Sequence, residues 1–337
     1  MNADGSAGPD NASFVRDTEP FRRELLAHCY RMLGSADDAE DLVQETYLRA
    51  WRAYDGFEGR SSVRTWLYRI ATNACLTALQ HHSRRVLPSG LCAPEPSPEA
   101  ASQRAESNIS WLQPISDALV IPESADPAVV FAARQGLRLA LIASLQYLPG
   151  TQRAVLILRD VLAFPAVEVA AMLGTSTPAV KSTLQRARAR LRELSPRPDA
   201  LAEPTESHAR ALLDRYMAAF QNADAAELER LLCDESTLEA PPIPTWLAGR
   251  RTCVPFLRRY VLGAEGDWLM LPTGANGQPA AVGYRRGDDG DYHAYGVVVL
   301  TVTPTGIAGV VSFGDPKLVP SFGFPSVVPA GGKFSVR

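Results

Sequence analysis

Residues 164–191 contain the pattern that most restricts how this chain can fold. Residues 165–173 have the apolar periodicity of a short helix. Gly174 follows and supplies the backbone freedom that a tight turn needs. Ser176 or Thr177 can then cap a second, longer helix, with a proline placed where a first helical turn tolerates it. The segment therefore predicts a helix-turn-helix.

The outer face of the second predicted helix is strongly cationic. Between 181 and 194 there are five basic residues and a single acid, Glu193, although the whole chain has a net charge of −3. Arginine and lysine neutralise phosphates, and the first turns of such a helix can contact base edges in the major groove. The alternative is a solvated cationic face, the usual meaning of a charge run. The residues expected to contact duplex DNA are Ser176, Thr177, Lys181, Ser182, Gln185, Arg186 and Arg188.

Composition sets the outer limits. A chain of 337 residues allows two or three domains, and its 46% hydrophobic and 21% charged fractions exclude wholesale disorder. It has no apolar run long enough to span a membrane, and its polar first residues do not form a secretory signal. Its five cysteines are scattered, with no CxxC pair and no zinc pattern. These features indicate reduced thiols, a cytoplasmic location and neither metal nor cofactor.

Shifts in composition divide the chain into segments. Helical periodicity dominates residues 21–87 and returns in residues 128–195. Between them, residues 88–127 form an acidic, proline-rich linker that cannot be one continuous helix. Residues 207–325 begin with two helical patterns and continue with strands, the clearest at 295–302. This order predicts an α+β domain after an all-helical front half.

Two blocks of the sequence resemble the extracytoplasmic-function group of bacterial RNA polymerase sigma factors. The first contains Asp38-Ala39-Glu40-Asp41-Leu42-Val43-Gln44-Glu45-Thr46 and continues through Arg64-Thr65-Trp66-Leu67-Tyr68-Arg69 to Asn73, which is similar to the family's second conserved region. The second runs from Leu148-Pro149-Gly150-Thr151-Gln152 to Arg188 and is similar to the fourth region. Together they cover under half of the chain, in the family's order.

The resemblance implies a role for each block. The helix with Asp38, Asp41, Leu42, Gln44 and Glu45 would bind core RNA polymerase, docking on the β′ subunit, with β as the other subunit contacted. A capped surface helix is the alternative. The melted minus-ten promoter element would be held by aromatic, amide and cationic groups, although Trp66 is expected mainly in the core. These minus-ten residues are Arg64, Trp66, Tyr68, Asn73, Arg84 and Arg85.

The linker contains an apolar patch, Trp111-Leu112-Gln113-Pro114, which is too apolar for a simple spacer and is expected to dock on something. It resembles a linker motif of family members with a long C-terminal extension. In the family this linker threads through the polymerase, and the acidity of the segment fits a channel lined with positive charge. A disordered tether is the alternative.

The C-terminal segment resembles the small α+β cone domains related to SnoaL-type polyketide cyclases, in which helices pack on a curved sheet around a pocket. The candidate pocket residues are Glu239, Trp246, Asp267 and His293. A His–Asp pair could perform acid–base chemistry, but a hydrogen-bonded structural histidine is the commoner case. We expect a regulatory lid that performs no catalysis and whose candidate ligand is a small molecule or a regulatory protein.

The sequence thus predicts two all-α sigma modules, the second a helix-turn-helix, followed by an α+β cone domain. The expected function is promoter-specific transcription initiation with core polymerase. Two alternatives are a ligand-sensing helix-turn-helix regulator that does not bind the polymerase core and a cyclase-like enzyme with a DNA-binding appendage.

Overall fold

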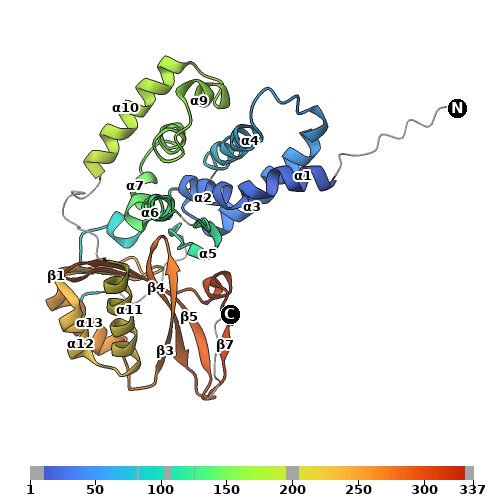
Figure 1. Cartoon of the computed structure of the whole chain (residues 1–337). Helices are drawn as coiled ribbons and strands as arrows, with labels where there is room; N and C mark the ends of the chain where they lie inside the picture. Colours follow the sequence, from blue (N-terminus) through green and yellow to red (C-terminus); the bar gives the residue numbers. More distant parts are fainter. Residues whose placement is uncertain (1–10, 82, 102–107, 125, 195–204, 331–337) are drawn as a thin grey trace. The chain divides into compact units, whose positions relative to one another are not determined.

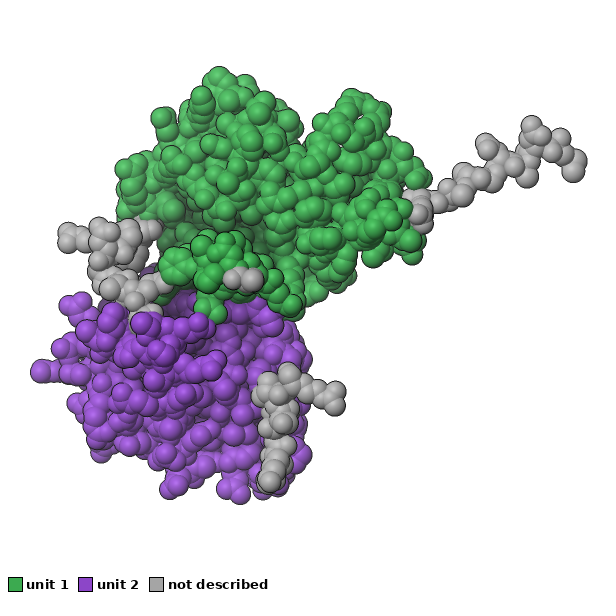
Figure 2. Space-filling view, viewed as in Figure 1, with its two compact units in different colours: residues 1–84, 119–195 green, residues 85–118, 196–337 purple. Residues whose placement is uncertain are grey.

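The structure, a computed structural model, describes residues 11–81, 83–101, 108–124, 126–194 and 205–330. The chain folds into two compact units (Figures 1 and 2). The first comprises residues 1–84 and 119–195, and the second comprises residues 85–118 and 196–337. The linker predicted at 88–127 is therefore divided between the two units, and most of it belongs with the C-terminal part of the chain.

The first helices of unit 1 begin and end at the signals that their sequences contain. Gly34, with φ of +71°, ends the second helix in a left-handed conformation. The Ser35 hydroxyl then caps the third helix by accepting from the amide of Asp38, and Ser62 caps the fourth by accepting from Thr65. The elements are α1 (Asn11–Thr18), η1 (Glu19–Phe21), α2 (Arg22–Leu33), α3 (Ala36–Ala53), η2 (Tyr54–Gly56) and α4 (Val63–Ala78).

Helix α1 was not predicted, because its sequence is mostly polar. Its anchor is Phe14, which is buried. The ring of Phe14 meets Trp51 and Tyr54 edge-on, with centroids 5.2 Å apart in both pairs, and meets Tyr47 at 6.2 Å. Such edge-to-face pairs stabilise a helix that otherwise offers little apolar surface.

The rest of unit 1 contains the predicted helix-turn-helix. Gly174 has φ of +60°, and the Ser176 hydroxyl accepts from the amide of Ala179 at the start of the second helix of the motif. The elements are α5 (Asp117–Val120), which begins in unit 2, α6 (Pro127–Gln135), α7 (Leu139–Leu145), α8 (Gly150–Leu156), a π-helical turn η4 (Ile157–Val161), α9 (Ala166–Met172) and α10 (Thr177–Leu194).

Two buried arginines join the two helical parts of unit 1. The Arg31 guanidinium on α2 donates to the carbonyl of Gly136 at 2.8 Å. The Arg153 guanidinium on α8 donates to the carbonyl of Met32, and also to Gln146 Oε1 at 2.7 Å. Burial lowers the pKa of each arginine to about 10. A buried charge is costly unless it is hydrogen-bonded. Separating the two helical parts would break the hydrogen bonds of both arginines, so these contacts hold the parts together.

Unit 2 is built on one sheet with strand order β2-β1-β6-β5-β4-β3, and β7 pairs with β5. Among the strands of the described residues, β1 and β6 form the one parallel pair. Helix α11 (Glu206–Gln221) packs on β3, β4 and β5, whereas α12 (Ala225–Leu231) and α13 (Arg250–Tyr260) pack near β1 (Figure 1). The strands are β1 (Leu232–Glu239), β2 (Trp246–Ala248), β3 (Trp268–Ala275), β4 (Gln278–Arg286), β5 (Tyr292–Thr303), β6 (Gly306–Phe313) and β7 (Val327–Val328), with 3-10 turns η3 (Pro88–Gly90) and η6 (Pro316–Phe322).

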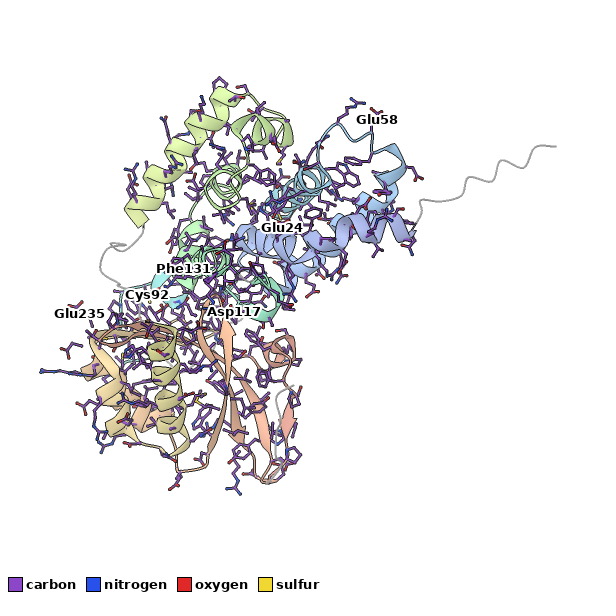
Figure 3. All side chains as sticks on the ribbon, in the orientation of Figure 1. Glu24, Glu58, Cys92, Asp117, Phe131 and Glu235 are labelled. Atoms are coloured by element: carbon purple, nitrogen blue, oxygen red, sulfur yellow. The ribbon has the colours of Figure 1, made fainter. Side chains whose placement is uncertain are left out.

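The linker residues of unit 2 pack on this sheet instead of forming a tether. Asn276, itself buried, accepts from the amide of Ile115 through its side chain at 3.1 Å and donates its own amide to the Ile115 carbonyl at 3.0 Å. The indole of Trp246 donates to the carbonyl of Cys92 at 2.9 Å, and Asp117 accepts from Gly277 at 2.7 Å. Cys92 and Asp117 are labelled in Figure 3. The expected docking of the apolar patch is confirmed, because Leu112 is almost completely buried.

The fold class matches the prediction in both units. The helical patterns expected in the C-terminal segment appear as α11 and α12, and the strand expected at 295–302 is the longer β5. Within the described residues, no single helix is long and apolar enough to cross a membrane, although α6 and α7 would satisfy those two criteria jointly, with a bend of 49° between them.

Candidate nucleic-acid interface and partner sites

The outer face of α10 is exposed and cationic, as its sequence predicts. Lys181, Gln185 and Arg186 are exposed. Arg188 is also exposed, but both oxygens of Asp160 accept from it, at 2.6 and 2.8 Å. The apolar side chains on the opposite face, Val180, Leu184 and Ala187, are buried. Helix α10 therefore packs through its apolar face and exposes its cationic face to solvent. Asp160 holds Arg188 of that face in place.

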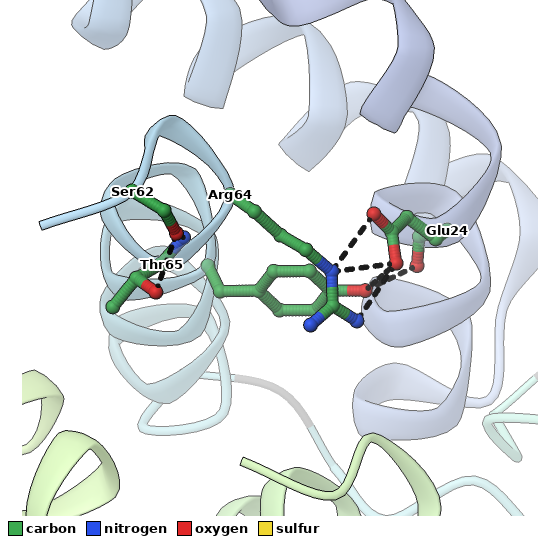
Figure 4. A network of polar contacts seen from close by, with 5 residues as sticks. Glu24, Ser62, Arg64 and Thr65 are labelled. Atoms are coloured by element: carbon green, nitrogen blue, oxygen red, sulfur yellow. Dashed lines mark hydrogen bonds and ion pairs between the residues drawn. The ribbon is translucent and has the colours of Figure 1, made fainter. Parts of the chain in front are cut away.

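Helix α4 does not place all of its predicted DNA-contacting residues at the surface. Tyr68 is fully buried, and its hydroxyl donates to the Glu24 carboxylate at 3.2 Å. Arg64 forms a two-nitrogen ion pair with Glu24, with contacts of 2.9 to 3.1 Å (Figure 4). The Arg64 guanidinium also lies over the rings of Tyr68 and Phe164, 5.0 and 4.5 Å from their centroids. In this structure these two residues brace α4 and do not face solvent freely.

The exposed part of α4 carries Trp66, Arg69 and Asn73. Trp66 is only half-buried, with its ring tilted against Phe57 at 4.7 Å, so the expectation that it lies mainly in the core holds only in part. Arg69 and Asn73 are exposed, and the Asn73 amide donates to the Arg69 carbonyl at 2.9 Å. A cavity of about 240 Å³ adjoins these residues, lined by Arg60, Ser61, Thr65, Trp66, Arg69, Val167, Glu168, Ala171 and Met172.

Arg84 and Arg85, the last two residues predicted at the minus-ten element, fall on either side of the boundary between the units. Arg84 is exposed in unit 1, with its guanidinium 4.2 Å from the ring centroid of Tyr147. Arg85 belongs to unit 2 and donates to the Trp111 carbonyl at 3.1 Å. Both cations are thus anchored on aromatic or carbonyl groups of their own unit.

The predicted polymerase-binding helix is α3, and its solvent face combines acids with apolar groups. Asp41 and Gln44 are exposed, while Asp38, Leu42 and Glu45 are half-buried. Leu48 shares this face and is 57% exposed. The sequence analysis did not select Leu48, although its spacing of i+4 from Gln44 and i+7 from Asp41 was a usable signal.

Of the four residues proposed to line a pocket in the C-terminal domain, Glu239 and Trp246 are cross-strand neighbours on β1 and β2, whereas His293 and Asp267 each bond to another partner. His293 is exposed and pairs with Asp289 at 2.9 Å, whereas Asp267 accepts from the amide of Ala264 at 2.8 Å. The turn before β5 brings Asp289 to the imidazole, so His293 is the hydrogen-bonded histidine that was the commoner expectation. Glu239 is buried and accepts from the amide of Ser89 at 2.9 Å. Trp246 bonds to the linker, as described above.

The interior of the cone domain is filled by its own aromatic side chains. The rings of Tyr216, Phe220, Trp268 and Tyr295 form a chain in which successive centroids are 4.9, 5.8 and 5.0 Å apart. Tyr216 and Trp268 are nearly inaccessible to solvent. Among the described residues, no three metal-ligating side chains cluster. The four rings therefore form part of the packed core of this domain.

Comparison with known proteins identifies two regions of this chain with a known family. Residues 18–85 match the model of Sigma-70 region 2, and residues 138–191 match that of Sigma-70, region 4. The chain is 48% identical over 312 residues to "ECF RNA polymerase sigma factor SigG" of Mycobacterium tuberculosis H37Rv, covering 91% of this chain and 82% of that protein. It is 28% identical to SigJ of the same strain over 289 residues, or 80% and 84% of the two chains.

One solved structure has the same fold over nearly the whole chain. The crystal structure of M. tuberculosis SigJ superposes with a TM-score of 0.58 at 24% identity, covering 93% of this chain and 99% of that one. Matches to regions 2 and 4 in one chain define a sigma factor of the sigma-70 class, and here a mixed-sheet domain follows the two helical modules. The chain belongs to the extracytoplasmic-function family of RNA polymerase sigma factors.

Proposed function

We propose that this sigma factor binds core RNA polymerase through α3 and directs it to promoters recognised by α4 and α10. The observation that carries the proposal is the pairing of a region 2 and a region 4 module in one chain, the second with an exposed cationic helix. The alternative regulator that works without polymerase would need only the helix-turn-helix, and it leaves the region 2 module unexplained.

The polymerase contact is proposed on the solvent face of α3. Asp41 and Gln44 would form a polar rim beside Leu48 and the half-buried Asp38, Leu42 and Glu45. A mixed acidic and apolar face suits a protein partner with a complementary basic rim. We assign this face to the β′ subunit, and β to the contact made by region 4.

The DNA contacts are proposed on two helices. On α10, Lys181, Gln185, Arg186 and Arg188, with Ser176, Thr177 and Ser182, would contact the minus-thirty-five duplex. On α4, Trp66 and Asn73 would contact the opened minus-ten strand, with Arg84 and Arg85 near its phosphates. Arg64 and Tyr68 would not contact DNA themselves. They would position α4, which carries Trp66 and Asn73, because the ion pair of Arg64 with Glu24 and the burial of Tyr68 fix this helix.

The C-terminal domain is proposed to regulate the sigma modules without catalysing a reaction, in the cytoplasm where the polymerase works. Its aromatic interior and the pairing of His293 with the exposed Asp289 support this assignment. The linker residues packed on its sheet offer a route by which a ligand or protein at this domain would act on initiation.

The test is transcription in vitro with purified core polymerase on a pool of genomic promoter fragments. Arg186→Ala with Arg188→Ala should abolish promoter-directed transcripts while co-purification with core polymerase is retained. The matched control is Arg258→Ala with Arg259→Ala, which removes two exposed arginines from α13. Transcription that is equal in both double variants would contradict the assignment of α10 to DNA.

A further inference from the structure

The tip of the β3–β4 hairpin is buried under the linker. Ala275 pairs with Gln278 across the hairpin, so Asn276 and Gly277 form a two-residue turn. Their φ values of +56° and +67° are those of a type I′ turn, in which asparagine followed by glycine is a favoured pair. Turns usually lie at the surface. Here Asn276 is completely buried, and Ser116 of the linker forms an antiparallel bridge with Ala275.

Three hydrogen bonds from the linker hold both residues of this turn. The Asn276 side-chain oxygen accepts from the amide of Ile115 at 3.1 Å, and the Asn276 amide donates to the Ile115 carbonyl at 3.0 Å. The Gly277 amide donates to the Asp117 carboxylate at 2.7 Å. The other oxygen of Asp117 lies so close to Gly274 that a methyl group added there would be 2.7 Å from it. The linker thus engages the side chain of Asn276 and the backbone amide of Gly277 together.

These two groups are the reactants of asparagine deamidation. The sequence contains a single Asn-Gly pair, and glycine has no side chain to hinder attack by its own nitrogen. In the reaction the Gly277 nitrogen bonds to Asn276 Cγ and loses its proton, while the Cγ–Nδ2 bond breaks and ammonia leaves. Water then opens the resulting succinimide to aspartate or isoaspartate. Water is the only other reactant.

The docked turn cannot start this reaction. In the left-handed conformation of Asn276 the next amide nitrogen lies nearly opposite Cβ across the Cα–C bond, so Cγ cannot reach it. Ring closure therefore requires the turn to leave this conformation, and that breaks its bonds to the linker. We infer that Asn276 is a site of spontaneous deamidation, kept dormant while linker residues 115–117 are docked on the hairpin.

Deamidation would also prevent the linker from docking again. The isoaspartate product adds one carbon to the backbone, which a two-residue turn cannot accommodate. The aspartate product places a negative charge at a completely buried position, on the same turn that already binds the Asp117 carboxylate. Either product therefore records, irreversibly, that the linker has left the sheet.

The test follows deamidation of Asn276 in the full chain at mildly alkaline pH, by the mass gain of its peptide. Asp117→Ala should accelerate it about tenfold to a hundredfold, because a hydrogen bond to a charged group is lost and the turn opens more often. Asp117→Asn keeps an acceptor oxygen and should stay near the wild-type rate. The matched control is Asp315→Ala, which removes a carboxylate that accepts from the amide of Lys317 elsewhere in unit 2, and it should change nothing.

Two results would overturn the inference. The first is an equal or slower rate in Asp117→Ala, which would show that the linker does not protect the turn. The second is a wild-type chain unfolded in guanidinium that deamidates at Asn276 no faster than the folded chain, which would show that the pair is not reactive.

The block to redocking is tested with a mimic of the aspartate product. Asn276→Asp should speed hydrogen exchange at the Ile115 amide about tenfold or more, since the buried charge weakens the docked form. Exchange as slow as in the wild type would show that the linker tolerates the charge, and would overturn the irreversible step for the aspartate product.

Discussion

The buried histidine of region 2 makes the stability of unit 1 depend steeply on pH. His28 on α2 is fully buried, and its Nε2 lies 3.0 Å from the Thr72 hydroxyl, while its Nδ1 has no hydrogen-bond partner among the described residues. Burial, helped by the charge of Arg31, lowers the pKa of His28 from 6.5 to about 3. The folded protein therefore keeps this imidazole neutral at a pH where the unfolded chain would protonate it.

The size of the effect follows from linkage. Because the pKa is lower in the folded state, the contribution of His28 to stability is present above pH 6.5 and is lost as the pH falls. Below pH 6.5 the free energy of unfolding should fall by about 1.4 kcal/mol per pH unit. Between pH 7 and pH 5 the cumulative loss from this residue alone is about 2 kcal/mol.

The assay is urea unfolding of the full chain, with unit 1 followed by pulsed hydrogen exchange in peptides from α2 and α4. The variant His28→Gln keeps a hydrogen-bonding amide near Thr72 but does not titrate. Its unfolding free energy should change about 2 kcal/mol less than that of the wild type between pH 7 and pH 5. Equal changes in the two proteins would refute the assignment of a neutral buried imidazole.

Three further predictions concern Glu239 and Asn276 of unit 2 and the buried Arg153 of unit 1. Burial raises the pKa of Glu239 above its usual 4.5, although its hydrogen bond from Ser89 opposes this. Because the pKa is higher in the folded state, the free energy of unfolding should fall as the pH rises and Glu239 becomes charged. Glu239→Gln should therefore unfold at higher urea concentration than the wild type at pH 7.5, and the difference should vanish at pH 4. A variant that is less stable than the wild type at pH 7.5 would contradict this prediction. Asn276→Gly removes the acceptor of the Ile115 amide and should speed hydrogen exchange there about 5- to 150-fold, which corresponds to 1–3 kcal/mol for an unpaired buried donor; unchanged exchange would show that the linker is held by other contacts. Arg153→Met removes the bonds to Met32 and Gln146, and should destabilise unit 1 by roughly 3 kcal/mol in the same urea assay, with a loss below 1 kcal/mol contradicting its joining role.

The helix-turn-helix could be predicted because its signals are local. Periodic apolar residues, Gly174 at the turn and Ser176 at the cap all act within a few residues, and the structure places each as expected. The strand β5 was predictable for the same reason, since its run of β-branched residues is bounded by turn residues and favours a strand.

The features that the sequence did not predict depend on contacts between distant residues. Tyr68 and Arg64 seemed suited to DNA, but Glu24, forty or more residues earlier, draws both into the body of unit 1. Asp289 pairs with His293 across the turn before β5, a partner that the sequence analysis did not name. Helix α1 depends on Phe14 meeting an aromatic cluster on α3 and η2, which no local pattern indicates.

The central claim is that this chain gives core RNA polymerase the ability to start at promoters. The most direct measurement adds the purified chain to sigma-free core polymerase and maps the 5′ ends of transcripts from a genomic fragment pool. The account predicts discrete start sites that appear only with the chain and disappear with the Arg186→Ala, Arg188→Ala variant. Transcripts with no defined start, or identical start sites with and without the chain, would contradict it.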